Sequence, residues 1–592
     1  MAKRRLVKFF LSLFILFVVV GVLAMVGAWV VVSRGPSVPD RSTLILRIGG
    51  ELVETTPNDV LGQVTGGARA ETVRGYVETL RRAKTDSRIQ SVVIMPTPFQ
   101  SPYWGKVQEI RDAVIDFRKS GKRVSAYLES AGEREYYLAT AAEKIYLIPT
   151  SSLDVTGIAT YELFLKGTLD KFGAQADFEK IGDYKTAPNQ LTQPTFTPAH
   201  REMTESLTRD MYEQLVRAIA ESRNKKVEDV RALIDEGPFL ARNAQRAGLV
   251  DVLAYEDQLD DHGAVSTSGT VEGESYGRSR RRGQLRGAPR VAVVYVTGII
   301  NSGDSGFDPL NGDVAGSAGL VKAIRSARAD DSVRAIVVRI DSPGGSSIAS
   351  DVIWRELTVT KNDKPARPIV ASMSDLAASG GYYVAMAAPH IVAQPATLTG
   401  SIGIYGGKFV TGGTYEKLGA NIESVVIGRN AGLESPERPF TESERQKLRE
   451  QIQDFYDGFV QKVAASRKLS VERVNQLAQG RVWTGAQARE NGLVDGLGGL
   501  DRAIELAKER AGISAETEVE IVNYPARKTL AELLLEQLSG SGNDRQMEAM
   551  LSVASGLRST ERRAIGLLTA PARLFRPGEP LALMPLSLLN FR

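Results

Sequence analysis

The sequence predicts an α/β protein that contains one type of domain twice and carries a transmembrane helix at its start. Long segments of the first half match segments of the second half. Such self-similarity indicates a duplication. In each half short apolar strands alternate with amphipathic helices, which is the pattern of α/β domains. Near the N-terminus, one apolar run is long enough to span a bilayer. With 592 residues the chain also exceeds what one hydrophobic core organises.

The apolar run extends from Phe9 to Val32 and follows four basic residues, Lys3, Arg4, Arg5 and Lys8. Its length and the positive-inside tendency predict an uncleaved anchor within residues 1–34, with a cytoplasmic N-terminus. A cleaved signal peptide is the alternative, but its apolar part spans only about 7–15 residues. We therefore expect a single-pass protein of the inner (cytoplasmic) membrane, with the rest of the chain on the outer face, which is the periplasmic face in a Gram-negative bacterium.

Matching segments set the boundaries of the two copies. Gly75 begins GYVETLRRAKTDSRIQSVVIMPTP, and Gly319 begins the similar GLVKAIRSARADDSVRAIVVRIDSP. Further matches extend the first copy over about 41–261 and the second over about 290–510. Residues 262–289, rich in Gly, Ser and Arg, are predicted to be an exposed linker, with a lipid-binding basic patch as the alternative. Residues 511–592 form a C-terminal extension outside the repeat.

Composition excludes several classes of function. The net charge of +4 is small for this length and does not indicate a nucleic-acid-binding protein. Because the chain has no cysteine, it has no disulfide, no thiolate metal site and no cysteine nucleophile. Only three histidines are present, His200, His262 and His390, which argues against a histidine-rich zinc site.

Two segments of the second copy contain candidate catalytic groups. DSPGGSS (Asp341–Ser347) follows the apolar strand AIVVRI, and a turn of this kind exposes backbone N–H groups that can stabilise an oxyanion. In the second segment, Ser372–Ala388, Ser379 stands between small residues at the start of an apolar helix. Each segment has a structural alternative: a simple Pro-Gly-Gly turn, and a serine that only caps a helix.

Comparison of the copies favours chemistry in the second one. With the matching tyrosine pairs aligned, Ser379 stands opposite Glu133, Gly380 opposite Arg134 and Gly344 opposite Phe99. Packing alone should require small residues in both copies. The sequence therefore predicts a serine nucleophile in the second copy.

A serine hydroxyl needs a base, and the first copy offers a lysine for this role. Lys185, in IGDYKTAPN, is opposite Ala431 in the second copy. Burial would have to lower its pKa by roughly 3 units for it to act near neutral pH. The alternatives are a surface loop lysine at this position, the nearby Lys180, and a histidine such as His390, which is poorly placed eleven residues after Ser379.

At these residues the chain resembles the signal peptide peptidase A (protease IV) family in its long, tandem form. The resemblance covers nearly all of 41–510 and the N-terminal anchor. It rests on DSPGGS, on LAASGGYY (Leu376–Tyr383), on LTGSIGIYG (Leu398–Gly406) and on YKTA around Lys185. It implies two crotonase/Clp-protease-like α/β domains, a lysine base from the first and a serine nucleophile from the second.

Carried over residue by residue, the resemblance implies that Ser379 is the nucleophile and Lys185 its general base. Ser401 would orient the lysine amine, with a strand-turn serine as the alternative. The N–H groups of Gly344 and Gly380 would form the oxyanion hole. No metal or cofactor is implied.

The resemblance also implies a membrane-bound serine endopeptidase that degrades remnant signal peptides and other apolar peptides as a homo-oligomer, a tetramer in the family. Ser374 and Asp375 stand where the family usually has glycine, and the C-terminal extension is longer than usual. Two other functions remain open: a non-catalytic oligomeric membrane scaffold and a crotonase-type acyl-CoA enzyme.

Overall fold

The structure is a computed structural model that describes residues 38–55, 71–278, 287–308, 312–363, 367–525, 579–584 and 590–591. Within these ranges, no helix combines the length and the apolar character needed to cross a membrane. The anchor predicted at Phe9–Val32 lies outside the described residues.

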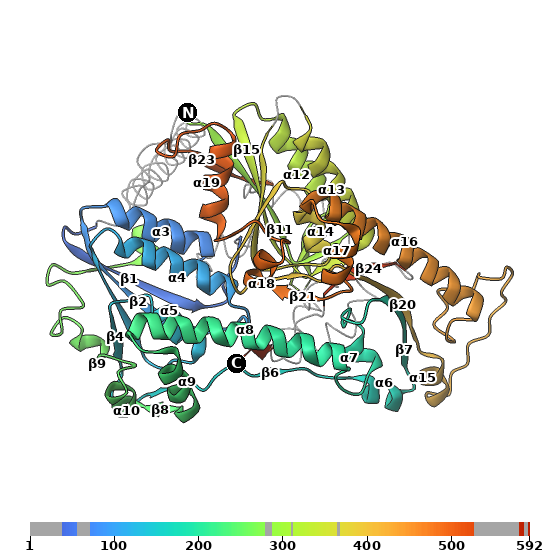
Figure 1. Ribbon diagram of the computed structural model, residues 1–592, viewed down its shortest axis with the longest axis horizontal. Coiled ribbons are helices and arrows are strands. Elements are labelled where there is room, and N and C mark those ends of the chain that lie inside the picture. The colour runs from blue at the N-terminus through green and yellow to red at the C-terminus, as the bar shows by residue number, and fades with distance from the viewer. Residues whose placement is uncertain are drawn as a thin grey trace, which may run out of the picture.

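The first copy is built on a six-stranded parallel sheet in the order β10-β1-β2-β3-β4-β9, drawn at the left of Figure 1. Its strands are β1 (Ser42–Gly50), β2 (Ile89–Phe99), β3 (Arg123–Leu128), β4 (Lys144–Leu147), β9 (Val252–Leu253) and β10 (Thr270–Glu272). Helices α3 (Val73–Thr85), α4 (Gly105–Arg118) and α5 (Glu133–Ala139) connect the central strands. The apolar stripe of α3 is buried, as its sequence pattern predicts.

The second copy repeats this arrangement. Its parallel strands pair as β23-β11-β15-β17-β18-β22, which corresponds strand for strand to the first sheet. They are β11 (Arg290–Thr297), β15 (Val333–Ser342), β17 (Ile369–Ala378), β18 (His390–Ala393), β22 (Gly496–Leu497) and β23 (Glu520–Tyr524). Equivalent contacts recur as well, because Tyr136 donates to Leu249 O and Tyr382 donates to Leu493 O. The predicted α/β duplication is confirmed.

Both faces of the second sheet are covered. Alternate residues of β11, starting with Val291 and Val293, pack against the apolar side of α19 (Leu500–Arg510). The intervening residues belong to a core shared with α12 (Ser317–Ala329), α13 (Ser347–Lys361) and α14 (Gly380–Ala385). This two-sided burial explains why the strands are continuous apolar runs.

A third sheet joins the copies. It has the order β13-β14-β12-β16-β24-β20-β7. In it β7 (Gln175–Ile181) of the first copy pairs antiparallel with β20 (Ile404–Val410) of the second. Figure 1 shows β7 at the right, far from the sheet of its own copy. The 26-residue helix α8 (Pro198–Arg223), about 39 Å long by helical rise, leads back toward the first copy.

The remaining helices and strands complete the fold, and among them α16 is the longest helix. The helices are α6 (Lys166–Phe172), α7 (Asn189–Thr192), α9 (Val227–Glu236), α10 (Ala241–Arg246), α11 (Gly273–Arg278), α15 (Gly412–Lys417), α16 (Glu442–Arg467), α17 (Val471–Leu477) and α18 (Gly485–Glu490). The strands are β5 (Ser152–Leu153), β6 (Thr160–Tyr161), β8 (Phe239–Leu240), β12 (Ile299–Asn301), β13 (Gly306–Asp308), β14 (Gly312–Gly316), β16 (Gly344–Ser346), β19 (Leu398–Gly400), β21 (Val482–Thr484), β24 (Leu581–Leu583) and β25 (Asn590–Phe591).

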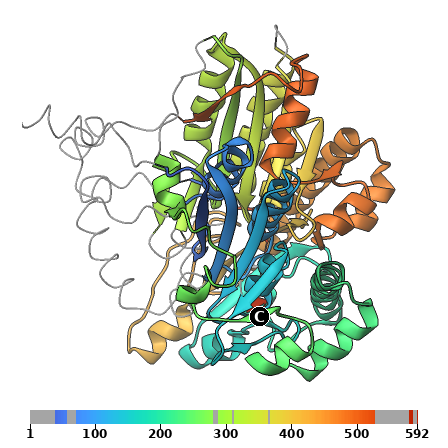
Figure 2. The same ribbon diagram turned by 90° about the vertical axis from the view of Figure 1, so that its left-hand side faces the viewer.

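Two expected boundaries differ from the structure. Part of the predicted linker 262–289 belongs to the first domain, because β10 pairs with β1 and α11 buries Tyr276, whose hydroxyl donates to Asp86. The predicted extension 511–592 supplies β23 to the second sheet and β24 to the third. Figure 2 shows β23, in red-orange, along the edge of the second sheet. Both errors concern short strands whose partners are distant in sequence, where local pattern is weakest.

Candidate functional site

Ser379 occupies the sharp turn between the buried strand β17 and helix α14. Its backbone has φ 55° and ψ −112°, which is rare and strained for a residue with a Cβ. The Ser379 N–H donates to Gly400 O at 2.8 Å, and this bond fixes the turn against β19. Strained backbone of this kind is found at functional sites because the surrounding fold must hold it in place.

Lys185 contacts the Ser379 hydroxyl. Its Nζ donates to Ser379 Oγ at 2.8 Å, to Ser401 Oγ at 3.1 Å and to Ser401 O at 3.2 Å. All three side chains are fully buried. Burial lowers the pKa of Lys185 well below its ordinary range. A lysine in such surroundings is neutral at lower pH than usual and can accept a proton.

The path of the chain explains how a first-copy lysine reaches a second-copy serine. Lys185 follows β7, whose pairing with β20 carries the chain to the second copy. A turn of the second copy then packs on the lysine backbone: a Cβ on Gly480 would lie 2.4 Å from Lys185 Cα. A Cβ on Gly403 would lie 3.2 Å from Lys185 Cδ. These two glycines give the lysine room beside the serines.

The other candidate bases have different partners. Lys180 Nζ donates to Asn189 Oδ1 at 3.2 Å and to Asp183 O at 3.4 Å. His200 Nε2 lies 2.9 Å from a Glu162 carboxylate oxygen, and both side chains are buried. His390 begins β18, away from the turn. Among the described residues, Lys185 is thus the basic side chain that bonds to Ser379.

Gly344 and Gly380 lie against each other beside Ser379. A Cβ on Gly344, whose φ is +98°, would lie 2.7 Å from the Gly380 nitrogen, so neither position has room for a side chain. The Gly380 N–H belongs to the first turn of α14, where amides lack a helical partner. The Gly344 N–H donates to Ser342 Oγ at 3.1 Å. The Ser342 hydroxyl would have to release the Gly344 N–H before this N–H could bind an oxyanion.

Strands β15 and β17, the second of which ends just before Ser379, carry part of a buried ionic network that sequence reasoning missed. Arg339 donates to both carboxylate oxygens of Glu54 at 2.8 Å and to Glu109 at 2.6 Å. Lys106 Nζ lies 2.7 Å from an oxygen of Asp341 and 3.4 Å from one of Asp375. Burial raises the pKa of Asp375 to about 6, although Lys106 opposes this shift. In the sequence, Arg339 inside the apolar run AIVVRI could have indicated this network, because a buried arginine needs carboxylate partners.

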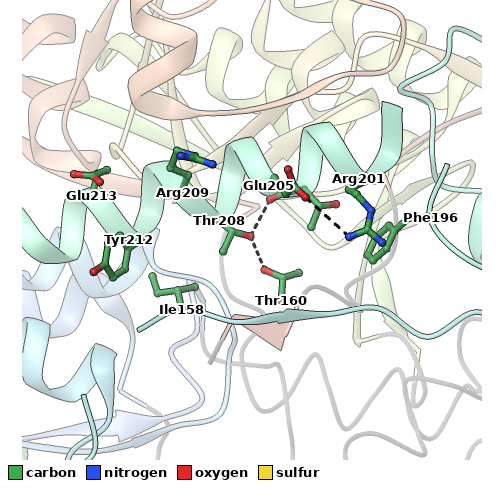
Figure 3. A pocket seen from close by; sticks show the side chains of 10 residues that line it. Ile158, Thr160, Phe196, Arg201, Glu205, Thr208, Arg209, Tyr212 and Glu213 are labelled. Atoms are coloured by element: carbon green, nitrogen blue, oxygen red, sulfur yellow. Dashed lines mark hydrogen bonds and ion pairs between the residues drawn. The ribbon is translucent and has the colours of Figure 1, made fainter. Parts of the chain in front are cut away.

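The structure also contains a surface pocket of about 460 Å³ along α8. Figure 3 shows it between that helix and the chain around Ile158 and Thr160, with Phe196 and Arg201 at one end. Its lining includes none of the candidate catalytic residues.

Comparison with known proteins identifies similar sequences. The profile described as peptidase family S49 matches residues 116–264 and 361–514. The chain is 34% identical to the chloroplastic serine protease SPPA of Arabidopsis thaliana, over 83% of this chain and 74% of that protein. It is 31% identical to protease 4 of Salmonella typhi, over 90% and 88% respectively. Among solved structures, a mutant of ClpP1 from Listeria monocytogenes shares 16% identity and a TM-score of 0.22, over 35% and 92%. A likeness this weak carries no argument.

Proposed function

The chain belongs to peptidase family S49 and is a serine protease; from this premise, we propose that it cleaves peptides with a Ser379–Lys185 dyad divided between its two copies. The 2.8 Å hydrogen bond from Lys185 Nζ to Ser379 Oγ is the observation that carries the proposal. The burial of both groups supports it, because a desolvated lysine is the kind of base that a serine hydroxyl requires.

In the proposed mechanism the neutral amine of Lys185 removes the hydroxyl proton while Ser379 Oγ attacks the peptide carbonyl. Ser401 holds the amine through its own hydroxyl and carbonyl oxygens. The lysine then gives the proton to the leaving amine, and an acyl-enzyme remains. Water, deprotonated by the same lysine, hydrolyses this ester and restores the serine. The N–H groups of Gly344 and Gly380 stabilise the oxyanion of each tetrahedral intermediate.

We assign apolar peptides, including remnant signal peptides, as the substrates. A relative from Enterococcus faecium has signal peptide peptidase in its name. Apolar side chains also lie close to the site in the chain: Ala187, two residues after Lys185, belongs to a buried cluster with Ile299 and Tyr405. With an N-terminal anchor in the inner membrane, the catalytic body would meet such peptides on the outer face.

The proposal predicts that a fluorophosphonate probe labels Ser379 and that the protein cleaves an apolar fluorogenic peptide. Ser379→Ala should remove the labelling and lower cleavage by about 10³-fold or more, because it deletes the nucleophile. Probe labelling read by mass spectrometry and cleavage rates of the full-length protein check this. Equal activity in Ser379→Ala would refute the assignment. If the parent protein shows no labelling and no cleavage, the scaffold function is favoured. Binding of coenzyme A would instead favour an acyl-CoA enzyme.

An exposed apolar surface supports the proposal that the protein is a homo-oligomer. Leu418, Val425 and Ile427, in the segment after α15, are 77%, 93% and 88% exposed. Phe172 of the neighbouring helix α6 is 66% exposed. Exposed clusters of this kind mark interaction sites. Figure 1 shows α6 and α15 at the far end of the β7–β20 arm, where a second copy could reach them.

We therefore expect Val425→Asp/Ile427→Asp to convert the assembled protein into single subunits, because two desolvated carboxylates would oppose contact. Light scattering after size-exclusion chromatography measures the mass. Leu240→Asp is the matched control, since Leu240 is also exposed but lies in β8 of the first domain. An unchanged mass for the double variant, or a parent that is already monomeric, would exclude this surface as the interface.

A further inference from the structure

A segment near the C-terminus lies in the sheet beside the candidate catalytic residues. Strand β24, Leu581–Leu583, pairs antiparallel with β16 on one side, so that Gly344 is opposite Leu583 and Ser346 opposite Leu581. On its other side β24 pairs with β20 through Tyr405 and Leu581. Figure 1 shows β24 beside β20, although these strands are far apart in the sequence.

The pairing with β16 continues beyond the strand itself. Ser347 N donates to Pro580 O at 3.3 Å, and Met584 N donates to Pro343 O at 2.8 Å. Ser346 Oγ also hydrogen-bonds to Glu579. Backbone pairing over five successive residues is how a protein binds an extended peptide by strand addition.

The same segment approaches both glycines proposed for the oxyanion hole. The Ala582 carbonyl oxygen would lie 2.1 Å from a Cβ on Gly344 and 3.1 Å from a Cβ on Gly380. A peptide bound for cleavage must bring a carbonyl to these residues. The segment therefore occupies the place that a substrate strand would need.

Side chains of the segment pack into buried apolar clusters. Leu581 and Leu583 point to one side, into the cluster formed with Ala187, Ile299 and Tyr405. Ala582 and Met584 are buried in the two main cores. All four side chains are almost completely buried. This alternation defines a site for an extended apolar peptide with large aliphatic side chains two residues apart.

We propose that residues 580–584 are an internal occupant of the peptide-binding groove between β16 and β20, and that a substrate must displace them. The proposal rests on the proposed function, since it takes Ser379 as the nucleophile. When β24 leaves, β16 and β20 each expose a strand edge, which an apolar substrate strand can pair with. A tethered competitor raises the apparent Kd for the substrate. This Kd equals the intrinsic Kd divided by the fraction of molecules in which the groove is open.

A disulfide tests the inference, because the chain has no cysteine of its own. Ser346 and Leu581 face each other between the hydrogen-bonded pairs of the ladder, where Cα atoms are about 4.5 Å apart, within the range of disulfides. In full-length Ser346→Cys/Leu581→Cys, oxidation should form the bond and lower cleavage of an apolar fluorogenic peptide at least about tenfold. Reduction should reverse the loss.

Each single cysteine variant, treated in the same way, is the control and should not respond to oxidation. Binding of a fluorescent peptide with the sequence of residues 579–584 gives a second readout that needs no catalysis. The oxidised double variant should fail to bind it, and the reduced one should bind. Failure of the disulfide to form, or its formation with unchanged cleavage and binding, would overturn the inference. Absence of Ser379-dependent cleavage in the reduced variant and in the parent would instead refute the proposed function, and peptide binding would still decide the occupancy.

Discussion

Lys185→Met should lower kcat/KM for an apolar peptide by about 10³-fold or more, while Lys180→Met should stay within a few-fold of the parent. Methionine keeps much of the volume of lysine but cannot accept the proton of Ser379, and loss of a general base costs about 10²–10⁴-fold even when the nucleophile remains. Lys180 is the matched control, because it is close in sequence and bonds to Asn189 and Asp183.

The pH profile gives an independent check on the role of the lysine. Burial lowers the pKa of Lys185, so the amine loses its proton at a pH well below the usual lysine range. Activity of the parent should therefore rise with pH as Lys185 deprotonates, and reach its plateau below the pH at which an ordinary lysine titrates. A profile that rises only near pH 10, or full activity in Lys185→Met, would exclude Lys185 as the base.

The same substitution should raise stability at neutral pH. In the unfolded chain Lys185 binds a proton below about pH 10.4, whereas the buried amine of the folded protein does not until its lowered pKa is reached. Between these two pKa values the unfolded state binds more protons, so stability falls as the pH falls. Methionine removes this penalty. Urea denaturation should show the gain of Lys185→Met at pH 7 and its decline toward pH 11.

Arg339→Leu should destabilise the protein by about 3–5 kcal/mol, because it leaves buried carboxylates without their cation. Arg339 is 1% exposed and bonds to Glu54 and Glu109, both from the first copy, while Arg339 belongs to the second. The variant should therefore also weaken the contact between the copies. The shift in the urea midpoint, multiplied by the slope of the transition, measures the change.

Arg325→Leu is the control for this prediction. Arg325 also pairs with a carboxylate, Glu356, but its side chain is 62% exposed, and solvent screens such surface pairs so that they contribute little to stability. Equal effects of the two substitutions would show that the buried network does not stabilise the protein. Lowering the pH should reduce the defect of Arg339→Leu, because the unpaired carboxyl groups then become neutral.

Much of the fold could be predicted because it depends on local pattern. Continuous apolar runs such as AIVVRI bury both faces of a strand, and amphipathic segments such as the one after Gly319 bury one face of a helix. The strands, the helices and the duplication are therefore visible in the sequence. The boundaries were less accurate. Strands β10 and β23 are short, and they exist because β1 and β11 offer free edges to them.

The candidate site divides in the same way. The sequence by itself determined that the second copy has Gly344, Ser379 and Gly380 where the first has bulky residues. It also offered Lys185 and the nearby Lys180 of the first copy as candidate bases. Only the tertiary structure decided that Lys185, and not Lys180, lies 2.8 Å from Ser379 Oγ. It also decided that Arg339 meets Glu54 and that Leu581–Leu583 lies beside Gly344. The residues in these contacts are far apart in the sequence: the separations are 194 positions, 285 positions and more than 200 positions, respectively. They depend on the path of the whole chain, which local burial patterns do not encode.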